Sequence, residues 1–153
     1  LSLKARALQW LAQREHSRVE LRRKLLARNA EADAAPEATV DALIDWLEAN
    51  RYFSPQRFVE SRVHARASRF GNLRIRQELA QHQVSLTPEA AQVLAASELE
   101  RARAVWSKRF AEPAADAAGH AKQARFLAAR GFSPEVIRRV LRGGPAGGSE
   151  GAE

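Results

Sequence analysis

Apolar residues recur along this chain at spacings of three and four, the spacing that gives an α-helix one buried face. Leu3, Ala7 and Trp10 open the first such series, and comparable series follow almost to the C-terminus. Runs with strict two-residue alternation, the signature of strands, are missing from the sequence. The pattern therefore predicts an all-α chain. The predicted helices cover residues 2–14, 17–28, 36–50, 55–70, 73–82 and 122–131, with a short helix after Thr87, one from near Glu98 and one after Ser133.

Helix starts and stops are marked by residues with specific local roles. The segment Ser17–Glu20 is a capping box, in which the serine side chain and the glutamate side chain each bond the other's backbone amide. Ser54, Thr87 and Ser133 each precede a proline, a pair that suits an N-cap and the first helical position. Gly71 predicts the end of a helix, because glycine tolerates the left-handed conformation of many helix stops.

One helical unit recurs with variation. Residues 73–79 align without a gap with residues 19–25, and Arg76 falls at the position of Arg22, inside the apolar arc. A single arginine there is explained by a side chain that reaches the rim, whereas two suggest a shared role. The spacing predicts stacking of the units into an elongated or curved array. The predicted parts are three-helix repeats over residues 1–52, 53–96 and 97–142 and a flexible glycine-rich tail over 143–153.

The net charge of +7 is distributed in alternating blocks. Residues 1–30 hold eight basic and two acidic side chains, whereas residues 31–50 hold six acidic and no basic ones. Residues 51–84 are basic again, with seven basic and two acidic side chains. Such blocks indicate either an acidic partner, for example nucleic acid or an acidic protein groove, or an ordinary solvated surface.

Arginines at repeat positions and on outward faces are the candidate contacts with such a partner. Arg62, Arg66 and Arg69 fall on one strip of a helix and are predicted to be unpaired. The other candidates from the pattern alone are Arg22, Arg23, Arg76, Arg138 and Arg139.

The sequence offers no pattern typical of a catalytic or metal site. It has no cysteine, which excludes disulfides and thiolate metal sites, and its four histidines lie far apart in sequence. No phosphate-binding loop or nucleophile motif is present, so we predict no nucleophile–base pair, no metal, no cofactor and no enzymatic activity. The acidic residues on the 36–50 helix are predicted to form a solvated stripe, and no apolar run approaches the roughly 18 residues of a membrane span.

Four segments together resemble the RecX family of RecA regulators. They read ALQWLAQREHSRVELRRKLLAR, YFSPQRFVESRV, RFGNLRIRQEL and KQARFLAARGFSPEVIRRVL, in this order along the chain. The resemblance implies tandem three-helix repeats and a cytoplasmic monomer that binds the filament of RecA on single-stranded DNA. It further implies inhibition of the filament's ATPase, strand-exchange and co-protease activities, weak binding to free DNA and no membrane partner.

The resemblance also implies roles for particular residues. It adds Arg74, Glu78 and Arg130 to the contacts and again points to Arg76. Gly71, Leu79, Gly131 and Phe132 are the structural positions of the same motifs. Two positions depart from the family pattern: Ser54-Pro55 stands where members often have an acidic pair, and Gln83 where they often have glycine.

A second class of function stays open, a helical protein that binds DNA directly. In this interpretation Gly71-Asn72 is the corner of a helix-turn-helix and residues 73–82 form its recognition helix. The apolar residues of that helix favour packing, which leaves few side chains for base edges.

Overall fold

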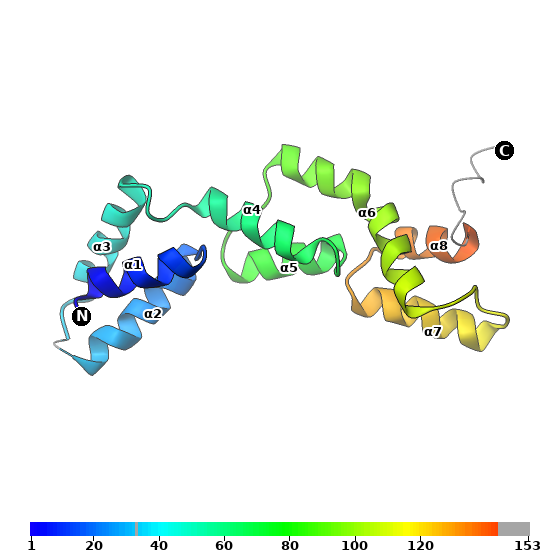
Figure 1. Cartoon of the computed structure of the whole chain (residues 1–153), viewed down its shortest axis with the longest axis horizontal. Helices are drawn as coiled ribbons and strands as arrows, with labels where there is room; N and C mark the ends of the chain where they lie inside the picture. The colour runs from blue at the N-terminus through cyan, green and yellow to red at the C-terminus, as the bar shows by residue number, and fades with distance from the viewer. Residues whose placement is uncertain (33, 144–153) are drawn as a thin grey trace. The chain divides into compact units, whose positions relative to one another are not determined.

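The computed structural model describes residues 1–32 and 34–143, which contain helices and no strand (Figure 1). The predicted all-α class is confirmed, while the tail predicted over 143–153 lies, from residue 144, outside the described residues. None of the described helices is both long and apolar enough to span a bilayer. The helices are α1 (Leu3–Gln13), α2 (Arg18–Glu31), α3 (Glu37–Ala49), α4 (Pro55–Arg66), α5 (Asn72–Gln81), α6 (Pro88–Arg109), α7 (Ala117–Ala129) and α8 (Pro134–Gly143).

Side-chain caps fix most of the helix starts. The Ser17 hydroxyl accepts a hydrogen bond from the amide three residues later at 3.1 Å, and Ser54 and Thr87 do the same at 3.1 Å. Asp116 caps α7 by accepting from the Gly119 amide at 2.8 Å. That cap begins α7 at Ala117, so the prediction of a start near residue 122 was wrong.

The helix α6 differs most from the prediction. A short helix after Thr87 and a new one near Glu98 were expected, but α6 is a single helix of 22 residues. No glycine or proline follows Pro88 within it, and alanine, leucine and glutamate favour the helical state throughout. The described chain therefore has eight helices where nine were predicted.

The described chain forms two compact units. Among the described residues, unit 1 comprises 1–62 and 79–85, and unit 2 comprises 63–78 and 86–143. The core of unit 1 is made by side chains of α1, α2 and α3 with Phe53, and Leu21, Leu25 and Ile44 are fully buried. The repeat boundaries at residues 52 and 96 and the stacked array stay predictions.

The core of unit 2 lies between α6, α7 and α8. Trp106 and Leu127 are buried there with Phe132, Ile137 and Val140. The indole Nε1 of Trp106 donates to the Gln123 side chain at 2.9 Å, so the polar group of the largest core residue is satisfied. This packing holds the end of α7 and the start of α8 against α6.

Candidate functional site

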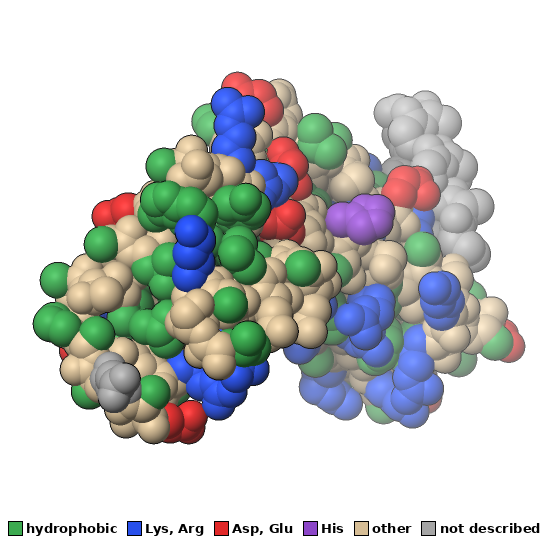
Figure 2. Space-filling model, turned by 60° about the vertical axis from the view of Figure 1, so that its left-hand side comes forward, with side chains coloured by type: hydrophobic (Ala, Val, Ile, Leu, Met, Phe, Trp, Pro, Cys, Tyr) green, Lys and Arg blue, Asp and Glu red, His purple; other side chains and the backbone are tan. Residues whose placement is uncertain are grey.

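Basic side chains differ in whether an acidic side chain neutralises them. On the face shown in Figure 2, Lys and Arg occur both beside acidic side chains and in groups with few acidic neighbours. In unit 1, Arg22 Nε contacts Asp41 at 2.7 Å and its Nη2 contacts Glu37 at 2.9 Å. Arg18 pairs likewise with Asp45 at 2.7 Å. The acidic stripe of α3 is solvated as predicted, with side chains 42–71% exposed, and it also pairs with arginines of α2.

The pairing of Arg22 also changes its titration. The hydrogen bond to Asp41 raises the pKa of the Arg22 guanidinium, and the same bond lowers the pKa of the Asp41 carboxyl. Arg76, which occupies the matching repeat position, is exposed on α5 and makes no ion pair with any described residue. The repeat thus conserves the position of the arginine but not its partners.

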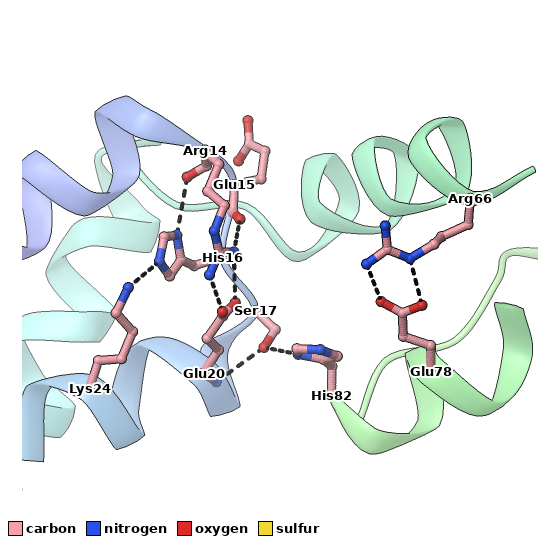
Figure 3. A network of polar contacts seen from close by, with 9 residues as sticks. All are labelled: Arg14, Glu15, His16, Ser17, Glu20, Lys24, Arg66, Glu78 and His82. Carbon is pink, nitrogen blue, oxygen red and sulfur yellow. Dashed lines mark hydrogen bonds and ion pairs between the residues drawn. The ribbon is translucent and has the colours of Figure 1, made fainter. Parts of the chain in front are cut away.

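The arginines at positions 62, 66 and 69 were predicted to be unpaired, and for Arg66 this prediction was wrong. The Arg66 guanidinium contacts Glu78 through both Nε, at 2.9 Å, and Nη2, at 3.1 Å, and both side chains are largely shielded from solvent (Figure 3). Arg62 lies over the Phe58 ring, 4.9 Å from its centre. Arg69 lies beyond the end of α4 and is exposed. Its guanidinium lies over the Phe70 ring, next to the glycine corner at residue 71.

Two glycine corners in unit 2 pack directly against each other. The Gly71 amide donates to the Arg130 carbonyl at 2.8 Å, and the Leu73 amide donates to the Gly131 carbonyl at 3.0 Å. A Cβ on Gly71 would lie 2.4 Å from the backbone of Gly131, far inside van der Waals contact. Gly131 has a φ of +89°, whereas Gly71 is not left-handed, which corrects the predicted reason for that glycine. Gly71 is needed because no room for a side chain exists.

The packed corners bring three arginines around one aromatic ring. The guanidinium carbons of Arg74, Arg69 and Arg130 lie 4.1, 5.1 and 5.7 Å from the centre of the half-buried Phe70 ring. None of the three makes an ion pair with the part of the chain that the structure describes. We call these residues the Phe70 arginine cluster. Like charges held together without a counter-charge attract anions.

Arg101 of α6 holds the cluster in place, a role that no pattern in the sequence indicates. It is half-buried, and its nitrogens make five hydrogen bonds. Burial lowers the pKa of its guanidinium, and the charge of Glu98 opposes that shift. The acceptors are the carbonyl oxygens of Ala67, Phe70 and Leu94, the Asn72 side-chain oxygen and the Ser97 hydroxyl.

Glu98, one turn before Arg101, joins two helix starts. Its buried carboxylate accepts from the Asn72 amide at 3.1 Å and from the amide and hydroxyl of Ser133, each at 3.4 Å. A carboxylate suits these unpaired N–H groups at helix N-termini. Its spacing of four from Leu94 and from Ala102 was the available signal, since it puts the acid within the buried stripe.

Comparison with known proteins decides the family. Residues 56–86 match the second three-helix domain of RecX, and residues 96–141 match the third. The regulatory protein RecX of Ralstonia nicotianae is 51% identical over 148 residues, which covers 95% of this chain and 90% of that protein. That of Pseudomonas fluorescens is 40% identical over 94% of this chain and 92% of its own length. This chain belongs to the RecX family.

Membership in the RecX family confirms the predicted resemblance and the three-helix domains. The family consists of regulatory proteins without enzymatic activity, so the chain is a regulatory protein and no enzyme. The two packed corners belong to two different matched domains: Gly71 lies in the second and Gly131 in the third. The Phe70 arginine cluster is thus built where two RecX domains meet within unit 2.

The remaining predicted contacts lie apart from these corners in the sequence. Arg23 is exposed on α2, and Arg138 and Arg139 are exposed on α8. The structural positions Leu79 and Phe132 are each only 1% exposed and pack inside the protein.

The fold brings together Ser17 and His82, which lie 65 residues apart in the sequence. The Ser17 hydroxyl and Nδ1 of His82 are hydrogen-bonded at 2.7 Å (Figure 3). Ser17 is fully buried and its hydroxyl also caps α2, so its hydrogen bond with His82 is structural and Ser17 is no nucleophile. Nearby, burial lowers the pKa of His16, whose Nε2 accepts from Lys24 at 2.8 Å. Among the described residues no group of side chains is placed to hold a metal.

Proposed function

We propose that this RecX-family protein regulates the RecA recombinase by binding the filament of RecA on single-stranded DNA. In this proposal it inhibits the filament's ATPase, strand-exchange and co-protease activities and works as a monomer in the bacterial cytoplasm. The observation that carries the proposal is the Phe70 arginine cluster, in which three guanidinium groups gather without an acidic partner from the described chain. A nucleoprotein filament offers both phosphates and acidic side chains to such a surface.

The distribution of charge between the units supports this assignment. Residues of unit 1 include eleven basic and nine acidic side chains, whereas residues 63–78 and 86–143 include fourteen basic and seven acidic ones. Arg22, a predicted contact, already has two acidic partners in unit 1. We therefore assign the main filament contact to unit 2 and give Arg69, Arg74 and Arg130 the largest share of it.

Direct binding to a duplex through a helix-turn-helix is the less well supported function. A recognition helix uses its N-terminal residues to reach base edges. In α5 the amide of Leu73 bonds to Gly131, and the Arg74 side chain donates to the Ala129 carbonyl at 3.4 Å. The start of α5 is therefore engaged by the corner at residues 129–131, which favours the filament proposal and weak binding to free DNA.

The test is the rate of ATP hydrolysis by RecA on single-stranded DNA. The unmodified protein should slow hydrolysis when added well below the amount of RecA, and the variant R69Q/R74Q should need about tenfold more protein for the same effect. The variant R18Q/R28Q loses the same charge from arginines paired inside unit 1 and should inhibit normally.

Two results would count against the proposal. If the unmodified protein leaves RecA hydrolysis unchanged at every ratio, the regulatory target is wrong. If R69Q/R74Q and R18Q/R28Q inhibit equally well and both keep their helical circular dichroism, the Phe70 arginine cluster is not the contact.

A further inference from the structure

A basic hollow lies beside the Phe70 arginine cluster. It has a volume of about 290 Å³ and is formed by the turn after α4, the last turn of α6 and the C-terminal half of α7, all within unit 2. The residues that matter for its chemistry are Ser68, Arg69, Lys108, Arg109, Phe126 and Arg130.

The hollow has four cationic side chains and no acidic one in its lining. Arg69, Lys108, Arg109 and Arg130 make no ion pair with any residue in the described ranges 1–32 and 34–143. Lys108 and Arg109 also lie in the last turn of α6, where a positive charge stabilises the helix by interacting with its dipole. That local role does not explain Arg69 and Arg130, which come from other segments and face the same hollow.

The wall between these cations is aromatic. The guanidinium carbons of Arg130 and Arg109 lie 5.1 and 5.7 Å from the centre of the Phe126 ring. Phe110 contacts Phe126 edge-on, with ring centres 5.4 Å apart, which fixes the orientation of both rings. Stacking on a ring restrains a guanidinium and leaves its in-plane N–H groups able to bind an anion.

We propose that this hollow receives a backbone phosphate of a single nucleic-acid strand, with Lys108 and Arg109 as contacts alongside Arg69 and Arg130. The proposal rests on the proposed function, because it names the component of the filament that this side of the cluster touches. Lys108 and Arg109 were not among the contacts that the sequence predicted.

Two features favour a nucleic-acid strand over an acidic protein surface. Four cationic side chains from three segments line one hollow, and a nucleic-acid strand carries one phosphate at every nucleotide that can neutralise them. The hollow also offers an aromatic and aliphatic wall, formed by Phe126 and Val105, beside the charges. Basic grooves with exposed aromatic side chains are typical of proteins that bind single strands without sequence preference.

The experiment measures fluorescence anisotropy of a fluorescein-labelled oligothymidylate of about 20 nucleotides, a length that exceeds common single-strand site sizes. The full chain is compared with K108Q/R109Q, in which two exposed side chains of the hollow lose their charge. The control K122Q/R125Q loses the same charge from exposed positions of α7 outside the hollow.

We expect K108Q/R109Q to weaken binding about tenfold and to make the slope of log affinity against log salt shallower by about 1.4, which corresponds to two lost phosphate contacts. The control should change affinity less than about twofold. Equal weakening in the two variants, or no weakening in K108Q/R109Q, would overturn the proposal. The same proteins are also tested with poly-glutamate. If K108Q/R109Q weakens poly-glutamate binding as much as oligothymidylate binding, the phosphate proposal is overturned in favour of an acidic protein partner.

The same proteins, added to RecA filaments, separate this proposal from the proposed function. If K108Q/R109Q loses oligothymidylate binding while even the unmodified protein fails to slow RecA hydrolysis, the phosphate site stands and the regulatory function falls. If the unmodified protein slows hydrolysis and K108Q/R109Q matches it in both assays, the phosphate site falls and the regulatory function stands. Circular dichroism and thermal unfolding of each variant verify that the chain is folded.

Discussion

Substituting Gly71 by alanine gives the strictest test of how unit 2 is built. The added Cβ would lie 2.4 Å from the carbonyl carbon and oxygen of Gly131 and from the Phe132 amide nitrogen. All three are backbone atoms, so no rotation of a side chain can relieve the contact. Ordinary carbon contacts need about 3.5–4.0 Å, which means that the two corners must separate by more than 1 Å, as an order of magnitude.

The cost follows from what the separation breaks. The bonds from the Gly71 amide to Arg130 and from the Leu73 amide to Gly131 are 2.8 and 3.0 Å long and would both be lost. Each is worth about 1 kcal/mol net, and overpacking at a tight contact adds about 1–3 kcal/mol. We therefore expect G71A to lower the free energy of unfolding of unit 2 by about 3–5 kcal/mol.

Urea unfolding followed by tryptophan fluorescence measures this effect in unit 2 alone. Trp106 is buried in its core, so replacing Trp10 and Trp46 by phenylalanine leaves a probe of unit 2. The matched control is G119A, because Gly119 lies within α7, and its Cβ would meet the Asp116 and Ala114 side chains at 3.1 and 3.2 Å.

We expect G119A to unfold within about 1 kcal/mol of the parent protein, since the helix propensity gained offsets the close contacts. The same comparison should extend to function. At temperatures where both variants remain folded, G71A should inhibit RecA filaments less well than G119A, because its arginines have moved apart. A G71A protein as stable as its parent would refute the reasoning that no space for a side chain exists between the corners.

Two further predictions concern buried charges. Burial by itself raises the pKa of Glu20, but the hydrogen bond and charge of Arg14 and the other groups around it lower that pKa to about 2. Because the pKa of Glu20 in the folded protein is below its ordinary value of 4.5, the ionised carboxylate stabilises the fold by about 3 kcal/mol above pH 4.5, and this stabilisation is lost as pH falls toward 2. The difference in urea stability between the parent protein and E20Q should therefore shrink between pH 4.5 and pH 2. A difference that stays constant over this range would contradict the lowered pKa of Glu20. Arg103 is 9% exposed; its Nη1 contacts the exposed Glu100 at 3.2 Å, but its Nε and Nη2 have no hydrogen-bond partner among the described residues. R103M should therefore raise the stability of unit 2 by about 1 kcal/mol, and a loss of that size would show that Nε and Nη2 are satisfied in solution.

The periodicity of apolar residues predicted most of the helices, because each amphipathic face is a local property of the sequence. It failed at α6, and the reason lies in Glu98. An acidic residue that interrupts an apolar stripe resembles the first turn of a new helix. Here the acid is buried within the stripe and bonds the starts of two other helices, a role that depends on residues 72 and 133. Tertiary contacts of this kind leave no local signal.

The family pattern carried information that periodicity could not. Gln83 stands where RecX members often have glycine, and its φ is +59°. A residue with a Cβ in the left-handed region costs about 1–2 kcal/mol relative to glycine. The departure therefore marks a real backbone requirement that this chain meets with a less suitable residue, and Q83G should be tolerated or stabilising.

Which arginines are paired could not be predicted, because the partners lie on other helices. Arg22 meets acids 15 and 19 residues away, and Arg66 meets one 12 residues away. The hollow is a stronger case, since residues 69, 108–109 and 130 converge only after α6, α7 and the turn after α4 have packed. Sequence patterns could nominate basic residues but not sort them into neutralised and available ones.

That sorting is also the best reason to regard the arginines of unit 2 as a binding surface. Side chains that serve only solubility need no fixed geometry, and mutual repulsion would normally spread them apart. Here two glycine corners, the five bonds of Arg101 and the carboxylate of Glu98 all hold Arg69, Arg74 and Arg130 around one ring. Holding like charges in a fixed arrangement costs stability, and an anionic partner that neutralises them gives that arrangement a function.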